Sequence, residues 1–370
     1  QDLPHRVTQD DHGQDEKAAA VKLCHAAHYT DPMRALAVCL VIGASLVLAA
    51  CSAGGAPAAA KGRLGASSEE FLVPPNPANP KAYAYVTLSV ADMDQALGLW
   101  AQRFGMQIVV RRQGTDPGLA RLWGVSDDAI IDQALLLTPG MQQGGVHLVR
   151  FRIPGPAVRD GASPTDLVPK SIDIAVRDIF ARYAELESAG YRFRSKIGRF
   201  ETDGVVVDEV HLPGPDAVNL VFLEQQGKPE PVSPQGYGVA PQIVAISADN
   251  KREKLFFESV LGLDETSYHR FAGAAVEQTI GLPSGGALDV RIFGDRGYDY
   301  GRLEIVQYEG VQSADLYPRA KAPARGLLSV TFFVSDVAAV LERAAALQRS
   351  AGTGAMRAAP IDHGVVTSLF

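Results

Sequence analysis

The hydrophobic and polar positions of the chain follow one plan four times. Each copy opens with a short apolar run of β type, and an Asp follows it. Apolar side chains then recur three and four positions apart, which is the spacing of one face of an α-helix. This pattern predicts a strand, a turn and an amphipathic helix in each copy. The four segments start at Tyr85, Ser171, Gln242 and Ser329.

Each predicted helix has recognisable ends. Asp is a preferred N-cap, because its carboxylate accepts hydrogen bonds from the free N–H groups of the first turn. Glycine enters the left-handed backbone region readily and is common directly after a helix. In the first copy Met93, Ala96 and Trp100 share the predicted apolar face. The predicted caps are Asp92, Asp178, Asp249 and Asp336, and the predicted closing glycines are Gly105, Gly190, Gly262 and Gly352.

Further strand patterns follow the helices, so that each copy reads as a βαβββ unit. The first and third caps, Asp92 and Asp249, are 157 residues apart, and the second and fourth, Asp178 and Asp336, are 158 apart. The units therefore come in pairs, and the pair is duplicated. A Pro- and Gly-rich stretch lies between the pairs and marks a boundary. We predict an α+β protein with domains in residues 81–227 and 241–370, a linker in 228–240, and a last unit truncated at Phe370.

Four such units in pairs resemble the vicinal oxygen chelate superfamily, which includes glyoxalases, bleomycin-resistance proteins and extradiol dioxygenases. The resemblance covers about residues 81–370. Leu99-Trp100 and Phe256-Phe257 stand where the family often has Phe-Tyr, and Gly214-Pro215-Asp216 resembles its turn before the last strand. The resemblance implies that each pair of units forms a glyoxalase-like domain, whose curled sheets enclose a cup for a small molecule. In some members the cup also holds a metal.

The resemblance further implies where metal ligands would stand, seven residues before each cap and in the last strand of each unit. These positions hold Tyr85, Ser171, Gln242 and Ser329, and then His147, Val221 and Glu304. Tyr and Ser are poor ligands for a divalent ion at neutral pH, and Val is none. The first pair of units therefore predicts no metal site. In the second pair Gln242 and Glu304 are candidate metal ligands, or else polar residues that line the cup.

Other activities find less support in the sequence. An extradiol dioxygenase needs two His and a carboxylate on iron, and the strand-one positions of the second pair hold no His. His211 lies in a strand beside Glu209 on one face, and we expect it to be exposed. There is no Ser-His-Asp order, no P-loop and no Rossmann glycine pattern.

Composition narrows the function classes. The chain has 370 residues, with 35 basic and 42 acidic side chains and a net charge of −7. No Lys/Arg cluster stands out, which argues against a nucleic-acid partner. The three cysteines are Cys24, Cys39 and Cys51, so neither a disulfide framework nor a Cys-based zinc site can occur after residue 51.

An export signal is predicted inside the sequence. Residues 35–50 form an uncharged apolar run, which Arg34 precedes and for which Met33 is a candidate initiator. As a helix the run would span about 24 Å, short of the roughly 30 Å hydrocarbon core, so residues 33–50 fit a secretory signal peptide. Residues 1–32 would then lie upstream of the natural product.

The end of this signal indicates a lipid anchor. Leu48-Ala49-Ala50-Cys51 resembles the lipobox of bacterial lipoproteins, which implies cleavage before Cys51 and a lipid on its sulfur. Residues 51–80 are rich in Ala, Gly, Ser and Pro and fit a tether. We therefore expect a membrane-anchored protein on the periplasmic or cell-surface side.

The expected function is binding of a small molecule in the cup of paired units, with no cofactor. One alternative is a metal-dependent lyase or isomerase of the glyoxalase type, which would hold a divalent metal in the second domain. Another is a scaffold for protein contacts. The residues expected to line the cups are Tyr85, His147, Ser171 and Ser329.

Overall fold

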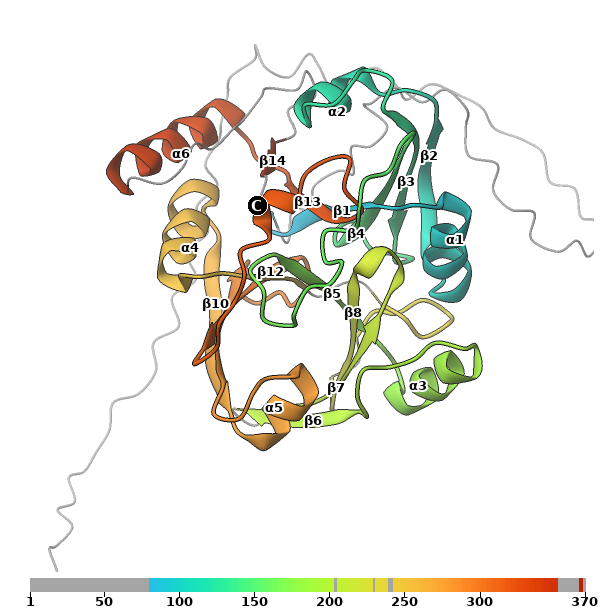
Figure 1. The fold of residues 1–370 in the computed structure, drawn as a ribbon, viewed down its shortest axis with the longest axis vertical. Helices are drawn as coiled ribbons and strands as arrows, with labels where there is room; N and C mark the ends of the chain where they lie inside the picture. Colours follow the sequence, from blue (N-terminus) through green and yellow to red (C-terminus); the bar gives the residue numbers. More distant parts are fainter. Residues whose placement is uncertain (1–79, 203–204, 229, 239–241, 352–365, 369–370) are drawn as a thin grey trace, which may run out of the picture. The chain divides into compact units, whose positions relative to one another are not determined.

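Two curled sheets carry the architecture, and each is built from two of the four units (Figure 1). The computed structural model describes residues 80–202, 205–228, 230–238, 242–351 and 366–368. Within these residues one sheet has six strands in the order β14-β13-β1-β4-β3-β2. The other has eight strands in the order β10-β11-β12-β9-β5-β8-β7-β6. Strands and helices are mixed along the chain, as an α+β protein requires.

Three of the units show the predicted βαβββ order, with short helices or turns added between strands. The first contains β1 (Tyr83–Ser89), α1 (Met93–Leu97), a π-helical turn (Gly98–Arg103), β2 (Gln107–Gln113), α2 (Pro117–Leu122), β3 (Ile130–Leu137) and β4 (Gly145–Phe151). The second contains β5 (Pro169–Ala175), α3 (Ile179–Ser188), β6 (Gly198–Thr202), β7 (Val205–Pro213), a 3₁₀ turn (Pro215–Ala217) and β8 (Asn219–Gln225). The third contains β9 (Gln242–Ile246), α4 (Asn250–Phe256), a π-helical turn (Phe257–Leu261), β10 (Asp264–Ala272), α5 (Ala274–Ile280), β11 (Ala287–Gly294) and β12 (Arg302–Glu309). In the fourth unit, a 3₁₀ turn (Tyr317–Arg319) comes before β13 (Gly326–Phe332), α6 (Val337–Ala351) and β14 (Val366–Ser368).

The ends of the helices confirm the capping pattern. Asp92 accepts hydrogen bonds from the backbone N–H groups of Asp94 and Gln95, at 2.9 and 3.0 Å. The other three predicted caps make the same kind of contact with their own first turns. Gly262 closes the third helix with a φ of 71°, in the left-handed region that glycine tolerates. Gly352 lies outside the described residues.

The pairing of the units differs from the prediction. β1 pairs antiparallel with β13, which joins the first unit to the fourth, and β5 pairs antiparallel with β9, which joins the second to the third. Within a unit the last strand covers only one edge of the first strand, as β4 does for β1. The other edge needs a partner. All four units offer the same kind of edge, and the apolar pattern does not specify which edges meet.

The largest hydrophobic core is shared by the two sheets. It includes Val86 and Leu148 from the six-stranded sheet and Ile172, Phe222 and Ile305 from the eight-stranded sheet. Side chains alternate between the two faces of a strand, so the neighbours of these core residues face the opposite side of their sheets. The inner face of the eight-stranded sheet is therefore left for a different set of side chains.

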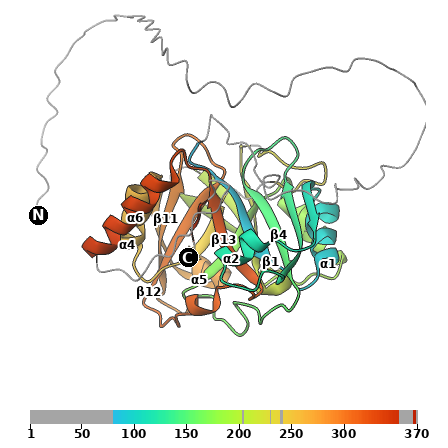
Figure 2. The ribbon, with the colours of Figure 1, turned by 90° about the horizontal axis from the view of Figure 1, so that it is seen from above.

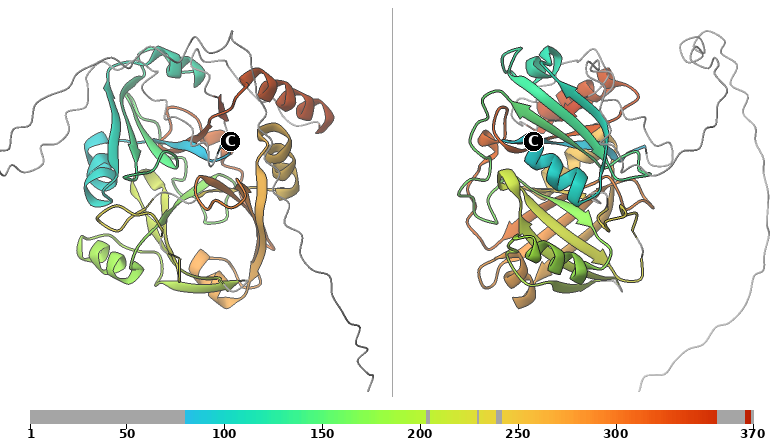
Figure 3. Two further views of the ribbon diagram at one scale, coloured as in Figure 1. Left: turned by 180° about the vertical axis from the view of Figure 1, so that it is seen from behind. Right: turned by 90° about the vertical axis from the view of Figure 1, so that its right-hand side faces the viewer.

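Helices pack against one another and against the ends of the eight-stranded sheet. Figure 2 shows α4 and α6 side by side, and the Arg343 Nε atom donates to the Val260 carbonyl oxygen at 3.0 Å between the two units. The eight-stranded sheet curls round until α5, which follows β10, lies beside β6 (Figure 3). A Cβ on Gly198 of β6 would lie 2.8 Å from the Thr279 hydroxyl of α5. No helix of the described residues is long and apolar enough to cross a bilayer.

Candidate functional site

The inner face of the eight-stranded sheet brings together four of the residues at ligand positions. Ser171 lies opposite Val244, and Val244 lies opposite Glu304, so these three side chains share one face. Gln242 is two residues from Val244 and belongs to the same face. Val221 also lies on it, opposite Asp173, which is two residues from Ser171. This face therefore collects the predicted positions of the second and third units.

Gln242 and Glu304, the two candidate metal ligands, touch each other. The Gln242 Nε2 atom donates to Glu304 Oε2 at 2.5 Å, and Gln242 Oε1 accepts from the Arg302 guanidinium at 3.4 Å. Burial, together with the charge of Glu209, raises the pKa of Glu304 from its ordinary value to about 7. Glu304 and Arg302 are only half-buried although both belong to the inner face.

Asp173 adds a second carboxyl group to this end of the face. It is buried, with 4% of its surface exposed, and the Gln242 side chain hydrogen-bonds to it. Burial and the nearby charge of Glu304 raise the pKa of Asp173 well above its usual range. Two neighbouring carboxyl groups oppose each other's ionisation.

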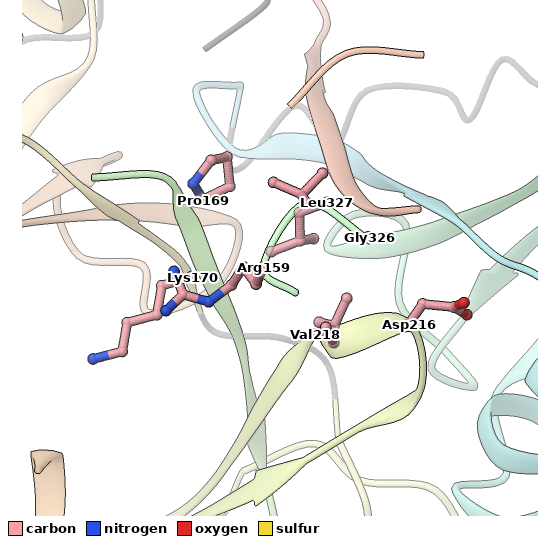
Figure 4. Close-up of a pocket in the computed structure, with 9 residues that line it drawn as sticks. Arg159, Pro169, Lys170, Asp216, Val218, Gly326 and Leu327 are labelled. Carbon is pink, nitrogen blue, oxygen red and sulfur yellow. The ribbon is translucent and has the colours of Figure 1, made fainter. Parts of the chain in front are cut away.

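Cationic side chains lie at the other end of the inner face of the eight-stranded sheet. The Lys170 ammonium donates to the Tyr308 hydroxyl and lies 5.0 Å from the centre of that ring. Burial, followed by repulsion from Arg159 and Arg194, lowers the pKa of Lys170 to about 7. In Figure 4 the side chains of Arg159 and Lys170 extend to the same side, away from Asp216.

The void drawn in Figure 4 is not the site itself. It lies between β5, β13 and the turn at Pro215–Ala217, and it is too narrow to admit a water molecule. Lys170 contributes to its wall, but the ammonium group reaches Tyr308 on the inner face of the eight-stranded sheet. The charged groups therefore belong to the interior of that sheet.

His211 corrects an expectation from the sequence. It is 2% exposed rather than on the surface, and it lies opposite Val221 on the inner face. Its Nε2 atom contacts Glu209 Oε1 at 2.7 Å, and its Nδ1 atom lies 3.3 Å from the Asn219 amide. Burial lowers the pKa of His211. The residue belongs to the charged interior.

The remaining predicted residues lie in the six-stranded sheet. Thr87 is opposite both His147 and Ser329, which places all three in one row, and the Tyr85 and His147 rings meet edge to face at 5.3 Å. Tyr85 and His147 are therefore grouped with Ser329, and not with Ser171 and Val221 as predicted.

A chain of hydrogen bonds fixes His147. The Arg112 guanidinium donates to Asp116 at 2.9 Å, and the Gln133 amide nitrogen donates to the same carboxylate at 3.1 Å. The Gln133 oxygen must then face His147 Nε2, 3.0 Å away, so this nitrogen carries the hydrogen. Nδ1 is left as an acceptor for the Thr87 hydroxyl at 3.4 Å. Burial lowers the pKa of His147 to about 3.

The ligand positions do not fit a metal centre of the kind that the resemblance implies. In the eight-stranded sheet they offer one carboxylate and one amide, from Glu304 and Gln242, while Ser171 and Val221 supply no good donor. The part of the chain that the structure describes contains no group of three His, Cys, Asp or Glu side chains arranged for a metal ion.

Lys170, Asp173, Arg159 and Arg194 were not recognised from the sequence. Lys170 and Asp173 did leave a signal, because both are charged residues in the short strand β5, in which every residue is buried. A charged residue at such a position is expensive unless it has a partner or a function. Arg159 and Arg194 lie in connecting segments, and no pattern distinguishes them from surface arginines.

Comparison with known proteins supports the fold. No family model matches the chain, and no curated protein matches it. Among solved structures, glyoxalase I from Zea mays aligns with a TM-score of 0.52 and 16% identity, over 77% of this chain and 86% of that one. Two single-residue variants of the same enzyme align with TM-scores of 0.53 and 0.52, also at 16% identity, over 77% of this chain and 85% and 87% of theirs. This similarity shows a shared fold of paired βαβββ units.

Proposed function

From the paired-unit fold of the vicinal oxygen chelate proteins, we propose that this chain binds a small molecule inside its eight-stranded sheet. The observation that carries the proposal is the set of ionisable groups on the inner face, where Glu304 and Arg302 keep partial contact with solvent. A face that served only as a core would be apolar, because buried charges cost free energy unless they are well paired. Perturbed groups of this kind are typical of binding and catalytic sites.

The proposed binding needs no metal. The Gln242 amide already donates a hydrogen bond to one Glu304 oxygen. Gln242 also hydrogen-bonds to Asp173 and Arg302, so its partners lie within the protein. These groups can donate hydrogen bonds to a polar ligand and accept hydrogen bonds from it. We also propose that the protein is exported and anchored through Cys51, which lies outside the described residues.

One observation favours the metal-dependent lyase as a second candidate. Gln242 and Glu304 occupy two positions that the resemblance assigns to metal ligands, and their side chains lie within 2.5 Å of each other. The two candidates differ in metal content. Elemental analysis of the full chain beside Glu304→Ala decides between them, because a stoichiometric metal that disappears in the variant would favour the lyase.

A thermal-shift screen tests the location of binding. Small molecules that stabilise the full chain should fail to stabilise Ile292→Trp, because Ile292 lies opposite Glu304 and a larger ring there would fill the interior. Leu255→Trp, at a site on α4 that is 55% exposed, is the matched control and should respond like the unmodified chain. If Ile292→Trp does not fold, Glu304→Gln serves as the second variant. Equal responses from the inner and outer variants would contradict the proposal.

A further inference from the structure

Lys170 is the one lysine that the described part of the chain buries. It lies in β5, it is 3% exposed, and its ammonium donates to the hydroxyl of Tyr308 on β12. Lysines are almost never fully buried unless they are paired, and buried lysines often have a chemical role. The other described lysines are either exposed or paired with a carboxylate. Lys196, Lys251 and Lys321 are exposed, and Lys81, Lys228 and Lys254 form ion pairs.

The surroundings of the Lys170 amine are largely apolar. Among the described residues it forms no ion pair with a carboxylate, and it contacts the hydroxyl and the ring of Tyr308, whose centre is 5.0 Å away. Tyr308 belongs to an apolar cluster on the inner face, together with Val306, Leu288 and Ile246. A buried charge without a counter-ion is costly. These surroundings therefore favour the neutral form of the amine.

Burial and neighbouring charges together determine the charge state of Lys170. Burial is the first cause that lowers its pKa to about 7, and repulsion from Arg159 and Arg194 follows. Glu209 and Glu304 attract the ammonium, but each has a smaller effect on the pKa. At pH 7 about half of the Lys170 amines are then neutral, whereas an ordinary lysine with a pKa of 10.5 is neutral in about one molecule in 3,000. The neutral amine carries the lone pair that a nucleophile needs.

Tyr308 supplies the second group that carbonyl chemistry needs. Burial raises the pKa of Tyr308, so its hydroxyl keeps its proton at neutral pH. When Lys170 is neutral, this hydroxyl can donate its proton to an oxygen bound next to the amine. A desolvated lysine amine beside a proton donor is suited to imine formation with a carbonyl compound.

We propose that Lys170 is a nucleophile that forms an imine with an aldehyde or ketone group of the ligand, and that Tyr308 donates the proton that this step needs. This inference rests on the proposed function and names the chemical class of its ligand. The amine nitrogen bonds to the carbonyl carbon, while the Tyr308 hydroxyl protonates the carbonyl oxygen and regains a proton from the nitrogen. The oxygen then leaves as water with both amine protons, so that a C=N bond replaces the C=O bond.

Reductive trapping on the full chain tests the inference. Propionaldehyde forms one arm and acetone the other, each with cyanoborohydride, which reduces an imine to a stable secondary amine. Peptide mass mapping gives the extent of modification at each lysine. At pH 7 at least one arm should modify Lys170 at least about tenfold faster than the exposed Lys251 and Lys321, because only Lys170 is substantially neutral. At pH 9 this preference should shrink, because ordinary lysines lose protons while Lys170 is already neutral. The arm that responds tells an aldehyde ligand from a ketone ligand.

Two variants examine the proton donor. Tyr308→Phe should slow the modification of Lys170 about tenfold at pH 7 and leave that of Lys251 unchanged. Tyr298→Phe, at an exposed position, is the matched control and should react as the unmodified chain does. A lysine that is merely buried is shielded from both reagents, so a Lys170 modified no faster than Lys251 in both arms would overturn the inference. Equal rates in Tyr308→Phe and Tyr298→Phe would overturn the role of Tyr308.

The imine and the proposed function can fail separately. Ligands that the thermal-shift screen finds and that Ile292→Trp excludes would uphold binding in the interior. If Lys170 in the same protein is modified no faster than Lys251, the imine alone is overturned and the proposed function stands.

Discussion

In the interior the pKa of an acidic residue is raised and the pKa of a basic residue is lowered, so that both come close to neutral pH. Burial raises the pKa of Glu304 to about 7, and burial with neighbouring cations lowers that of Lys170 to about 7. Sequence patterns located Glu304 because its strand position is defined by the resemblance. They missed Lys170, because the predicted strand begins at Ser171, whereas β5 begins at Pro169 and includes Lys170. His211 was misplaced because alternation along a strand does not tell which face turns inward.

His147 leads to a prediction about acid stability. Its pKa is about 3 in the folded protein against an ordinary 6.5, so between these values the unfolded chain binds more protons. The stability that depends on neutral His147 is complete above pH 6.5 and is lost as the pH falls toward 3, by about 1.4 kcal/mol per pH unit. His147→Gln should lack this component, so its stability should fall about 2 kcal/mol less between pH 6.5 and 5.

Denaturant unfolding at several pH values measures the effect. The difference in unfolding free energy between the unmodified chain and His147→Gln should shrink on acidification, whatever the variant costs at neutral pH. His269→Gln in the edge strand β10 is the matched control. Parallel stability curves for the unmodified chain and His147→Gln would show that the imidazole is not held neutral.

At the scale of elements, local chemistry was the most predictable part of the fold. The four caps followed from one Asp per unit, because a cap depends only on the turn that it begins. The π-helical turns that extend α1 and α4 were not predicted, since apolar spacing does not distinguish them from regular helix. Strand partners were not predictable in the same way, because the sequence of a strand does not identify the distant strand that pairs with its edge.

The third cap gives the prediction at this scale. Asp249 Oδ1 accepts hydrogen bonds from the backbone N–H groups of Lys251 and Arg252, at 3.0 and 3.1 Å. Asp249→Ala leaves these donors to water and should lower the free energy of unfolding by about 1 kcal/mol. Asp127→Ala, on an exposed turn of the first unit, is the control. Equal stability of the two variants in urea would mean that α4 does not depend on its cap.

At the scale of the whole molecule, each sheet needs both halves of the chain. β1 needs β13, and β5 needs β9, so neither half completes a sheet alone. Residues 81–227 by themselves would expose two strand edges, and exposed edges associate with other chains. We therefore expect this fragment to be aggregated or to melt without cooperativity. Co-expression with residues 241–370 should restore a soluble, cooperatively folding complex. A monomeric fragment 81–227 with a sharp unfolding transition would contradict the cross-pairing.

The predicted lipid anchor on Cys51 would determine where the folded units are held. Residues 33–51 lie outside the described residues, and the anchor is predicted from the apolar run and from Cys51 after Leu48-Ala49-Ala50. Acyl chains on Cys51 would each add about 0.8 kcal/mol of membrane affinity per buried CH₂. Cys51→Ala should therefore leave the precursor uncleaved or release the protein from the membrane fraction. Cys39→Ala, inside the apolar run, is the matched control and should be processed normally. Fractionation followed by mass measurement of the mature N-terminus reads out both steps, and a Cys51→Ala protein that is cleaved and membrane-bound as before would refute the lipid anchor.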